Sequence, residues 1–287
     1  MGKNNREKYK IGIIGCGFVG SAVAYGFSLH SEIRIYDKFQ ITPNTLEETV
    51  NGSDFLFVCV PTPMDDNGKQ DLTAVCDALE SIDDVANSKK IIILKSTILP
   101  GTTRGLAEKF TNHNLIFNPE FLTERTAKLD FINTARIVLG GDDEESLNKV
   151  EALYKNRFVH TPIYKTTWEG AELVKYMANC FFALKVSYLN EIYDIAEKLG
   201  IKYDDLKKMF LADGRIGNSH ADVPGHDGDR GFGGKCFIKD INALVQWADK
   251  NNFELNTLKA AIKTNKRVRT LKDWEEIPGA TTKNNYK

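Results

Sequence analysis

The chain has 287 residues, enough for one large domain or, more naturally, two. Its 38 basic and 39 acidic residues nearly cancel, so charge gives no reason to expect nucleic acid or an anionic membrane as a partner. No apolar run approaches the roughly 20 residues of a membrane span, and the charged N-terminus lacks the apolar stretch of a signal peptide.

Cysteine usage points to the redox compartment. The five cysteines show no paired or CxxC spacing and no metal-binding pattern with the five histidines. We therefore expect reduced thiols, no metal site and a cytoplasmic location.

The first motif is a glycine-rich turn after a short strand. Residues 9–14 are apolar enough for a buried strand and run directly into Gly15-Cys16-Gly17-Phe18-Val19-Gly20, after which the composition is helical. In such a turn the first glycine makes the bend, the second lets the backbone approach a pyrophosphate, and the third allows close helix packing. The N–H groups of the following helix can then bind the phosphates.

The end of the second predicted strand, residues 33–36, indicates which dinucleotide binds. Asp37 follows that strand, and its carboxylate can accept hydrogen bonds from ribose hydroxyls and would repel a 2′-phosphate. This favours NAD over NADP, although the adjacent Lys38 works against that preference. A purely structural glycine turn is the less probable alternative.

Alternating strands and helices continue to about residue 140. Strands are predicted near 54–60, 91–94, 115–117 and 136–140, and helices near 71–86 and 102–110. This alternation predicts an α/β, Rossmann-like, doubly wound parallel sheet, in which ligands bind outside the carboxyl ends of the strands. Asp54 lies only seventeen positions after Asp37, so the crossover there must be short.

The second half predicts helices. From residue 168 to 199 there is no proline, and apolar residues recur every three or four positions, which predicts one helix of roughly 48 Å ending at Gly200. Shorter helices are expected near 203–211, 237–250 and 256–268. We therefore predict an NAD-binding domain (1–166), an all-helical central domain (167–270) that forms a homodimer through the long helix, and a loose tail (271–287).

Two features of this half have chemical potential. Cys236 follows a glycine-rich turn and precedes a predicted helix, where the positive partial field lowers a thiol pKa and favours the thiolate. A cysteine that only fills space is an equally good interpretation of this segment alone. Lys175 and Asn179 lie four residues apart and so share one face of the long helix, although a helical lysine is usually a solvated charge.

Taken in order, these motifs resemble the UDP-glucose/GDP-mannose dehydrogenase family from about residue 9 to residue 268. The segments that carry the resemblance are VPTP (60–63), KSTILPGT (95–102), NPEFLTE (118–124), Arg215-Ile216-Gly217 and GFGGKCFIKD (231–240). The resemblance implies a nucleotide-sugar substrate whose C6 hydroxymethyl group is oxidised to a carboxylate by two NAD molecules. UDP-glucose, oxidised to UDP-glucuronate, is the first choice, with GDP-mannose and N-acetyl hexosamine derivatives as alternatives.

The resemblance also implies roles for individual residues. Cys236 would form a thiohemiacetal and then a thioester, and Lys175 would stabilise the developing oxyanion. Asp240 would place or activate water. The other catalytic residues expected are Thr97 and Glu124 near water and nicotinamide, Glu120 in proton transfer, and Asn179 on the sugar and oxyanion.

The binding residues follow from the same motifs. The cofactor-binding residues expected are Gly15, Gly17, Phe18, Val19, Gly20, Asp37, Lys38, Pro61, Thr62, Ser96, Thr97 and Glu124. The substrate-binding residues expected are Glu120, Phe121, Leu122, Lys175, Asn179, Arg215, Arg230, Gly231, Phe232 and Gly233. Arg215 resembles an arginine that reaches the sugar of the neighbouring subunit.

The chain departs from the family pattern in several places. Lys235, Ile238 and Arg125 replace the usual serine, proline and glycine, and the link from 215 to 231 is longer than usual. Family members continue into a second nucleotide-binding domain, so we expect a short form in which the 218–230 loop compensates, with Arg230 pairing with the diphosphate.

Two other functions remain open at this stage. A two-domain β-hydroxyacid dehydrogenase would suit the length but performs a single oxidation and leaves GFGGKCFIKD without a purpose. A catalytically impaired NAD-binding homologue is the non-enzyme alternative.

Overall fold

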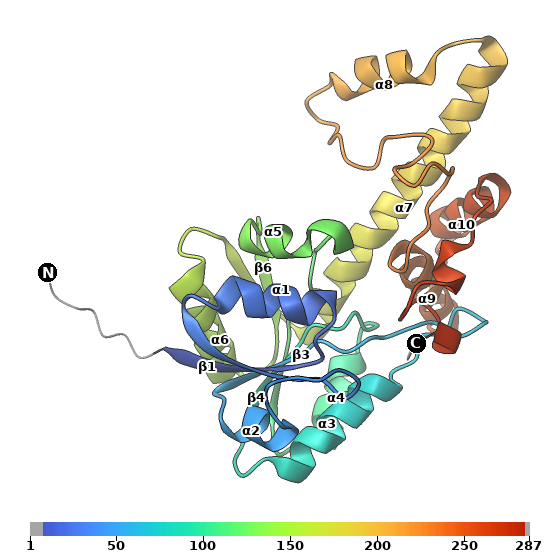
Figure 1. Cartoon of the computed structure of the whole chain (residues 1–287). Helices are drawn as coiled ribbons and strands as arrows, with labels where there is room; N and C mark the ends of the chain where they lie inside the picture. The colour runs from blue at the N-terminus through green and yellow to red at the C-terminus, as the bar shows by residue number, and fades with distance from the viewer. Residues whose placement is uncertain (1–7, 285–287) are drawn as a thin grey trace, which may run out of the picture. The chain divides into compact units, whose positions relative to one another are not determined.

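The computed structural model describes residues 8–284, and the chain forms two compact units (Figure 1). The first comprises the described residues up to Thr62 together with Leu72–Lys175, and the second comprises Pro63–Asp71 and the described residues from Tyr176 onward. Helix α7 (Trp168–Leu199) begins in the first unit and continues in the second. This division lies nine residues beyond the predicted 166/167 boundary (175 − 166) and adds a segment from the first half to the second unit.

A seven-stranded sheet forms the centre of the first unit, with strand order β2-β1-β3-β4-β5-β6-β7 (Figure 1). The strands are β1 (Tyr9–Ile14), β2 (Ser31–Tyr36), β3 (Phe55–Val58), β4 (Ile91–Leu94), β5 (Asn114–Phe117), β6 (Ile137–Gly140) and β7 (Ile163–Thr166). All pairs are parallel except β5 with β6, which meet antiparallel at Phe117 and Gly140. The predicted Rossmann-like class is therefore confirmed, with one antiparallel neighbour that was not expected.

Helices cover both faces of this sheet. One face packs against α1 (Phe18–Phe27), α5 (Ala127–Ile132) and α6 (Glu144–Arg157). The other packs against α2 (Leu46–Asn51), α3 (Thr73–Val85), α4 (Thr102–Lys109) and the start of α7. The predicted short crossover is α2, a six-residue helix that Thr45 and Glu48 stabilise with a capping box.

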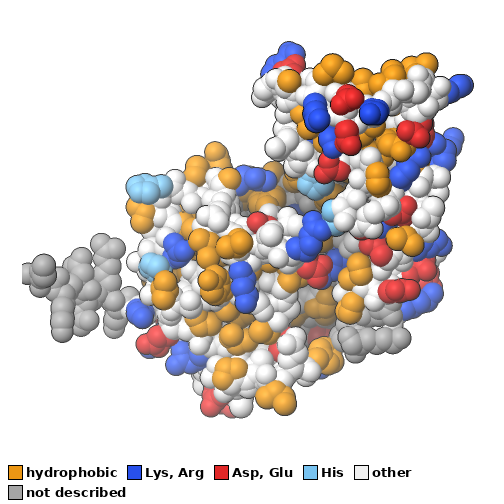
Figure 2. All heavy atoms as spheres, turned by 45° about the horizontal axis from the view of Figure 1, so that its top comes forward, with side chains coloured by type: hydrophobic (Ala, Val, Ile, Leu, Met, Phe, Trp, Pro, Cys, Tyr) orange, Lys and Arg blue, Asp and Glu red, His pale blue; other side chains and the backbone are white. Residues whose placement is uncertain are grey.

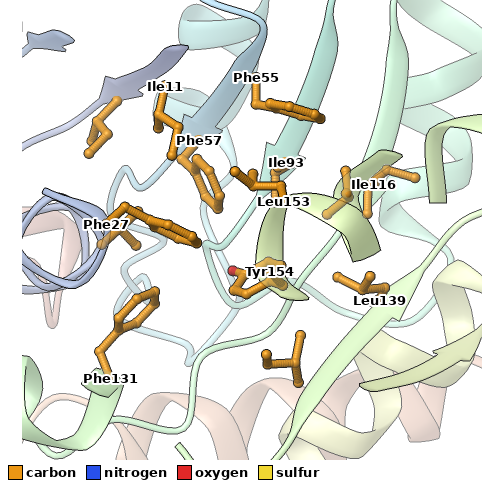
Figure 3. Packing of buried hydrophobic residues seen from close by; sticks show 14 of the residues in the cluster. Ile11, Phe27, Phe55, Phe57, Ile93, Ile116, Phe131, Leu139, Leu153 and Tyr154 are labelled. Carbon is orange, nitrogen blue, oxygen red and sulfur yellow. The ribbon is translucent and has the colours of Figure 1, made fainter. Parts of the chain in front are cut away.

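The core explains why the central strands are apolar throughout. Successive residues of a strand point to opposite faces, so strands covered on both sides need apolar residues at every position. On the first face, Phe27 makes edge-on ring contacts with Phe131 and Tyr154, at centroid distances of 5.8 and 5.4 Å (Figure 3). Strand β7 was not predicted, because its residues are half-buried or exposed and form no apolar run.

The second unit is helical. The remainder of α7 is followed by α8 (Tyr203–Leu211), α9 (Phe237–Lys250) and α10 (Asn256–Val268), which confirms the predicted helices. The chain after α10 contains the 3₁₀ turns Asp273–Glu275 and Thr282–Asn284. Met64 donates its N–H to the Ala280 carbonyl at 3.1 Å and accepts from Thr282 N at 2.9 Å. The prediction of a loose tail from residue 271 did not anticipate this pairing, and residues 285–287 lie outside the described part.

None of the helices within residues 8–284 is both long enough and apolar enough to span a membrane. Basic and acidic side chains are interspersed over the face drawn in Figure 2.

Candidate functional site

The glycine-rich loop joins β1 to α1 at the edge of the sheet where the parallel strands end. Gly15 has a φ of 94°, a left-handed conformation that favours glycine. A side chain at Gly20 would overlap the carbonyl oxygen of Gly15, so the first turn of α1 can approach the loop only with glycine there. The loop therefore has the geometry that the motif predicts.

Gly17 is the position that faces outward. It is exposed, and a Cβ atom built on it would meet no heavy atom within 4 Å. Gly17 is also the N-cap of α1, where no side chain caps the helix and the first turn carries no acidic residue. Open space beside uncapped N–H groups suits a pyrophosphate, so these residues fit a dinucleotide. Phe18 and Val19 are half-buried in the first turn of α1.

Asp37 is held against the same loop. One carboxylate oxygen accepts from Cys16 N at 2.7 Å, and the other accepts from Phe39 N at 2.8 Å and Gln40 N at 3.1 Å. The neighbouring Lys38 has its ammonium 3.6 Å from the Asp77 carboxylate, which balances part of its charge. The structure thus places the predicted ribose-binding carboxylate beside the predicted phosphate-binding loop.

The segments that follow β3 and β4 are tied to each other. The Ser96 hydroxyl donates to the Val60 carbonyl at 2.6 Å, and the Thr62 hydroxyl donates to the Thr97 carbonyl at 2.7 Å. Thr62, Ser96 and Thr97 are buried, whereas Pro61 is exposed. Because β1, β3 and β4 are neighbours in the sheet, these predicted cofactor-binding segments lie at adjacent strand ends.

The segment after β5 contains a buried ion pair. Lys175 Nζ donates to Glu120 Oε1 at 2.7 Å, and both side chains are almost fully buried. Burial by itself would raise the pKa of Glu120, but the Lys175 ammonium and the Leu122 N–H, 2.6 Å from the carboxylate, hold it below its usual value. The Lys175 ammonium also lies 5.8 Å from the centre of the Phe121 ring. The sequence singled out the segment 120–122 and Lys175 as parts of two different motifs, and the fold brings them together.

Lys95 is a buried residue to which the motifs assigned no role. Its ammonium donates to the Asn118 carbonyl at 3.1 Å and to Asn118 Oδ1 at 2.8 Å, and burial lowers its pKa to about 8. Lys95 therefore fixes the turn that leads to Glu120. A cavity of about 20 Å³, enough for one water molecule, is lined by Lys95, Glu120 and Tyr154 among others. The sequence feature that could have identified Lys95 is its position directly after an apolar strand.

Glu124, a predicted catalytic and cofactor-binding residue, is exposed at the start of the 3₁₀ turn Glu124–Thr126.

Cys236 and Asp240 lie in the second unit at the start of α9. Cys236 is the half-buried N-cap of that helix, and no side chain caps the helix there. Asp240 N donates to the Cys236 carbonyl at 3.0 Å, so the two residues are one helical turn apart. The Asp240 carboxylate is 1% exposed and accepts from Asn179 Nδ2 at 2.6 Å and Lys239 Nζ at 2.5 Å. The fold thus joins three predicted site residues, with Lys239 as an additional partner.

The glycine-rich loop before Cys236 is held by residues that the sequence did not single out. Phe232, between Gly231 and Gly233, donates its N–H to Asn265 Oδ1 at 2.7 Å and accepts from Asn265 Nδ2 at 3.0 Å. Gly234 N donates to Asp273 Oδ2 at 2.8 Å. These bonds fix the backbone that leads into the N-cap of α9.

The two predicted arginines differ in their surroundings. Arg230 donates to Asn190 Oδ1 at 3.1 Å, to the Asn190 carbonyl at 3.0 Å and to Asp194 Oδ1 at 2.5 Å. The sequence did not indicate these partners of Arg230. A diphosphate that paired with Arg230 would have to replace their hydrogen bonds. Arg215 pairs with Asp213 at 2.5 Å, and its side chain is 89% exposed.

Replacing Gly17 with alanine is expected to weaken NAD binding about tenfold or more without impairing folding. The new methyl group would meet no protein atom but would occupy the space in which a pyrophosphate approaches the backbone. Calorimetric titration with NAD and a thermal melt measure the two effects. Gly105→Ala in α4 is the matched control, because a Cβ there also meets nothing within 4 Å. Equal NAD affinity in the Gly17 variant and the wild type would contradict the assignment of this loop.

Comparison with known proteins adds an independent observation. Residues 32–158 match the model of the UDP-glucose/GDP-mannose dehydrogenase family, NAD binding domain, and residues 169–267 match that family's central domain. The chain is 33% identical over 245 residues to UDP-glucose 6-dehydrogenase TuaD of Bacillus subtilis and 35% identical over 239 residues to UDP-glucose 6-dehydrogenase of Rickettsia conorii. These matches cover 83% and 80% of the chain but only 52% and 53% of the relatives, so the chain spans about half their length.

A solved structure is similar over a larger share. A UDP-glucose dehydrogenase from Pyrobaculum islandicum superposes with a TM-score of 0.82 at 28% identity, covering 93% of this chain and 70% of that one.

Proposed function

The chain belongs to the UDP-glucose/GDP-mannose dehydrogenase family, and we propose that it oxidises the C6 hydroxymethyl group of a nucleotide sugar to a carboxylate. NAD is its cofactor, since residues 32–158 match the family's NAD binding domain. UDP-glucose is the first substrate to test, because the two relatives from Bacillus subtilis and Rickettsia conorii are UDP-glucose 6-dehydrogenases. The observation that carries the proposal is Cys236 at the N-terminus of α9, one turn before the buried Asp240 carboxylate.

A covalent intermediate can hold the aldehyde between two oxidations of the same carbon. In the first, the alcohol loses a hydride and a proton and becomes an aldehyde. The Cys236 thiolate then adds to the aldehyde carbon, and the resulting thiohemiacetal alkoxide loses a second hydride to become a thioester. Water cleaves the thioester, which releases the carboxylate and returns the thiol. Bound NAD supplies the hydride acceptor, one molecule for each oxidation.

Lys175 suits the negative charge that develops on oxygen in these steps. A fixed ammonium stabilises an alkoxide or a tetrahedral oxyanion best in a dry setting, and Lys175 is only 2% exposed. Its hydrogen bond to Glu120 orients the ammonium and gives the departing alcohol proton a nearby acceptor. We assign the developing charge to Lys175 and the proton transfer to Glu120.

Asp240 suits the final hydrolysis. Its carboxylate is buried and accepts hydrogen bonds from Asn179 and Lys239, which fix its orientation. A carboxylate one helical turn from the thioester sulfur can position water for attack. We assign this role to Asp240, with Thr97 and Glu124 assisting at the nicotinamide end and Arg215 and Arg230 contacting the substrate.

A count of NADH per sugar tests the proposal. The chain is incubated with excess NAD and limiting UDP-glucose, GDP-mannose or a UDP-N-acetyl hexosamine, and the sugar acid is measured by mass spectrometry. We expect two NADH and one uronate for each sugar consumed. One NADH with a hydroxyacid would favour the β-hydroxyacid alternative, and none with any compound would favour an NAD-binding protein without this activity.

We further propose a homodimer formed through α7. Exposed large apolar residues follow one face of this helix, at positions Leu173, Met177, Phe181, Tyr188 and Ile195, with exposed fractions of 47% to 68%. Their spacing of four and seven residues keeps them in one stripe, which in water favours burial against a partner.

Met177→Glu is expected to convert the dimer to a monomer in sedimentation experiments. The control is Leu129→Glu, since Leu129 is 60% exposed on α5 and lies outside the stripe. A monomeric wild-type chain at tens of micromolar would overturn the dimer.

A further inference from the structure

Glu172 is a buried carboxylate to which neither the motifs nor the mechanism above assign a role. Its side chain is fully buried. It accepts hydrogen bonds from Gly101 N at 2.7 Å, Thr103 N at 2.7 Å and the Thr103 hydroxyl at 2.5 Å. A charged or polar group in such a setting is retained only when its hydrogen bonds are made, and all three donors come from one short segment.

These contacts make Glu172 the cap of α4. The N-cap residue of that helix is Gly101, which has no side chain to offer, and the first turn of α4 carries no acidic residue. The carboxylate therefore arrives from α7, about 70 residues away in sequence, and binds the N–H groups at the positive end of the helix dipole. The Glu172 carboxylate from α7 thus takes the place of a capping side chain at the N-terminus of α4.

The segment capped in this way begins with the predicted catalytic Thr97. Its near end is tied to the segment after β3, through the hydrogen bonds of Ser96 with Val60 and of Thr62 with the Thr97 carbonyl. At its far end, Gly101 and Thr103 donate hydrogen bonds to the Glu172 side chain. Glu172 therefore holds the end of this segment that lies at the N-terminus of α4.

The same residue belongs to the helix that carries the predicted catalytic lysine. Glu172 precedes Lys175 by three positions, which is close to one helical turn on α7. We call the segment from Thr97 to Thr103 the Thr97 loop. The hydrogen bonds of Glu172 therefore link this loop to the turn of α7 that carries Lys175.

We propose that Glu172 is a positioning residue that holds the Thr97 loop in place relative to the Lys175 turn of α7. The proposal rests on the proposed function, because it assigns the loop and the lysine to one reaction. Misplacement of a reacting group by about 1 Å can cost roughly 100-fold in rate, so such a contact has a measurable effect on turnover.

A nearby ion pair provides a matched control. Glu169 and Arg104 also join α7 to α4, with Arg104 Nε 2.6 Å and Nη2 3.1 Å from the Glu169 carboxylate. This pair lies at the surface, with side-chain exposures of 36% and 42%. If Glu172 only joined the two helices, losing Glu169 would have a comparable effect.

The experiment compares Glu172→Gln with Glu169→Gln. Glutamine is similar in size, but its NH₂ group would face backbone N–H donors that now bind a carboxylate oxygen. We expect Glu172→Gln to lower the turnover number at least tenfold while the NAD dissociation constant changes less than threefold. Amide hydrogen exchange at Gly101 and Thr103 should accelerate. Glu169→Gln should leave turnover within twofold and those amides unchanged.

Equal turnover in the two variants would overturn the proposal, as would unchanged exchange at Gly101 and Thr103. If Glu172→Gln fails to fold, Thr103→Val removes only the hydroxyl donor, and we then expect a two- to fivefold loss of turnover. Wild-type turnover in that variant would overturn the proposal. If the wild-type chain oxidises no nucleotide sugar, the proposed function fails by itself, and equal exchange in the two glutamine variants would show that Glu172 does not hold the loop.

Discussion

Replacing Cys236 with alanine is expected to abolish formation of the sugar acid, a loss of at least about 10³-fold. Without the thiolate no thiohemiacetal or thioester can form, so the second oxidation loses its covalent route. The half-buried N-cap position on α9 should remain folded, because a smaller side chain there removes no capping bond. Uronate is measured by mass spectrometry, and NADH by absorbance, in the same reaction.

The matched control for this variant is Cys76→Ala. Cys76 is also half-buried and also helical, but it lies on α3, far in sequence from the α9 segment. We expect the control to retain wild-type turnover and two NADH per sugar. Acid production by Cys236→Ala at the wild-type rate would exclude the covalent mechanism while leaving NAD binding to be judged separately.

Replacing Lys175 with methionine is expected to lower turnover by at least about 100-fold, the scale observed when an oxyanion-stabilising group is lost. The same change leaves the buried Glu120 carboxylate without its ion-pair partner. Breaking a buried pair on one side costs roughly 3–5 kcal/mol of folding stability. Steady-state kinetics and urea denaturation measure the two effects.

The double variant Lys175→Met/Glu120→Gln separates catalysis from stability. With the carboxylate neutralised, no buried charge lacks a partner, so much of the lost stability should return. Turnover should stay as low as in the single variant, since the ammonium is still missing. Recovery of turnover with stability would show that Lys175 acts only in folding.

This pair also predicts how stability depends on pH. The Glu120 pKa is held below its ordinary value of 4.5, so the folded state favours the ionised carboxylate. Its contribution is therefore present above about pH 4.5 and is lost as the pH falls through the lower, folded-state pKa. The double variant should lack this part of the acid transition.

Local patterns in the sequence determined most of the secondary structure. Helical periodicity without proline predicted α7 from Trp168 to Leu199, and glycine spacing predicted the turn between β1 and α1. These patterns work because they reflect contacts between residues that are close in the chain. Elements whose signal depends on distant partners, such as the edge strand β7, were missed.

The sequence by itself identified the family through its ordered motifs and named Cys236, Asp240, Lys175, Glu120 and Asn179 as candidates. Only the tertiary structure decided which of them meet: Lys175 pairs with Glu120 across 55 positions, and Asn179 pairs with Asp240 across 61. It alone showed Glu172 as the cap of α4 and gave Arg230 its partners on α7. The physical reason is that a buried charge must find its hydrogen bonds wherever packing brings donors and acceptors together, and no local pattern records that choice.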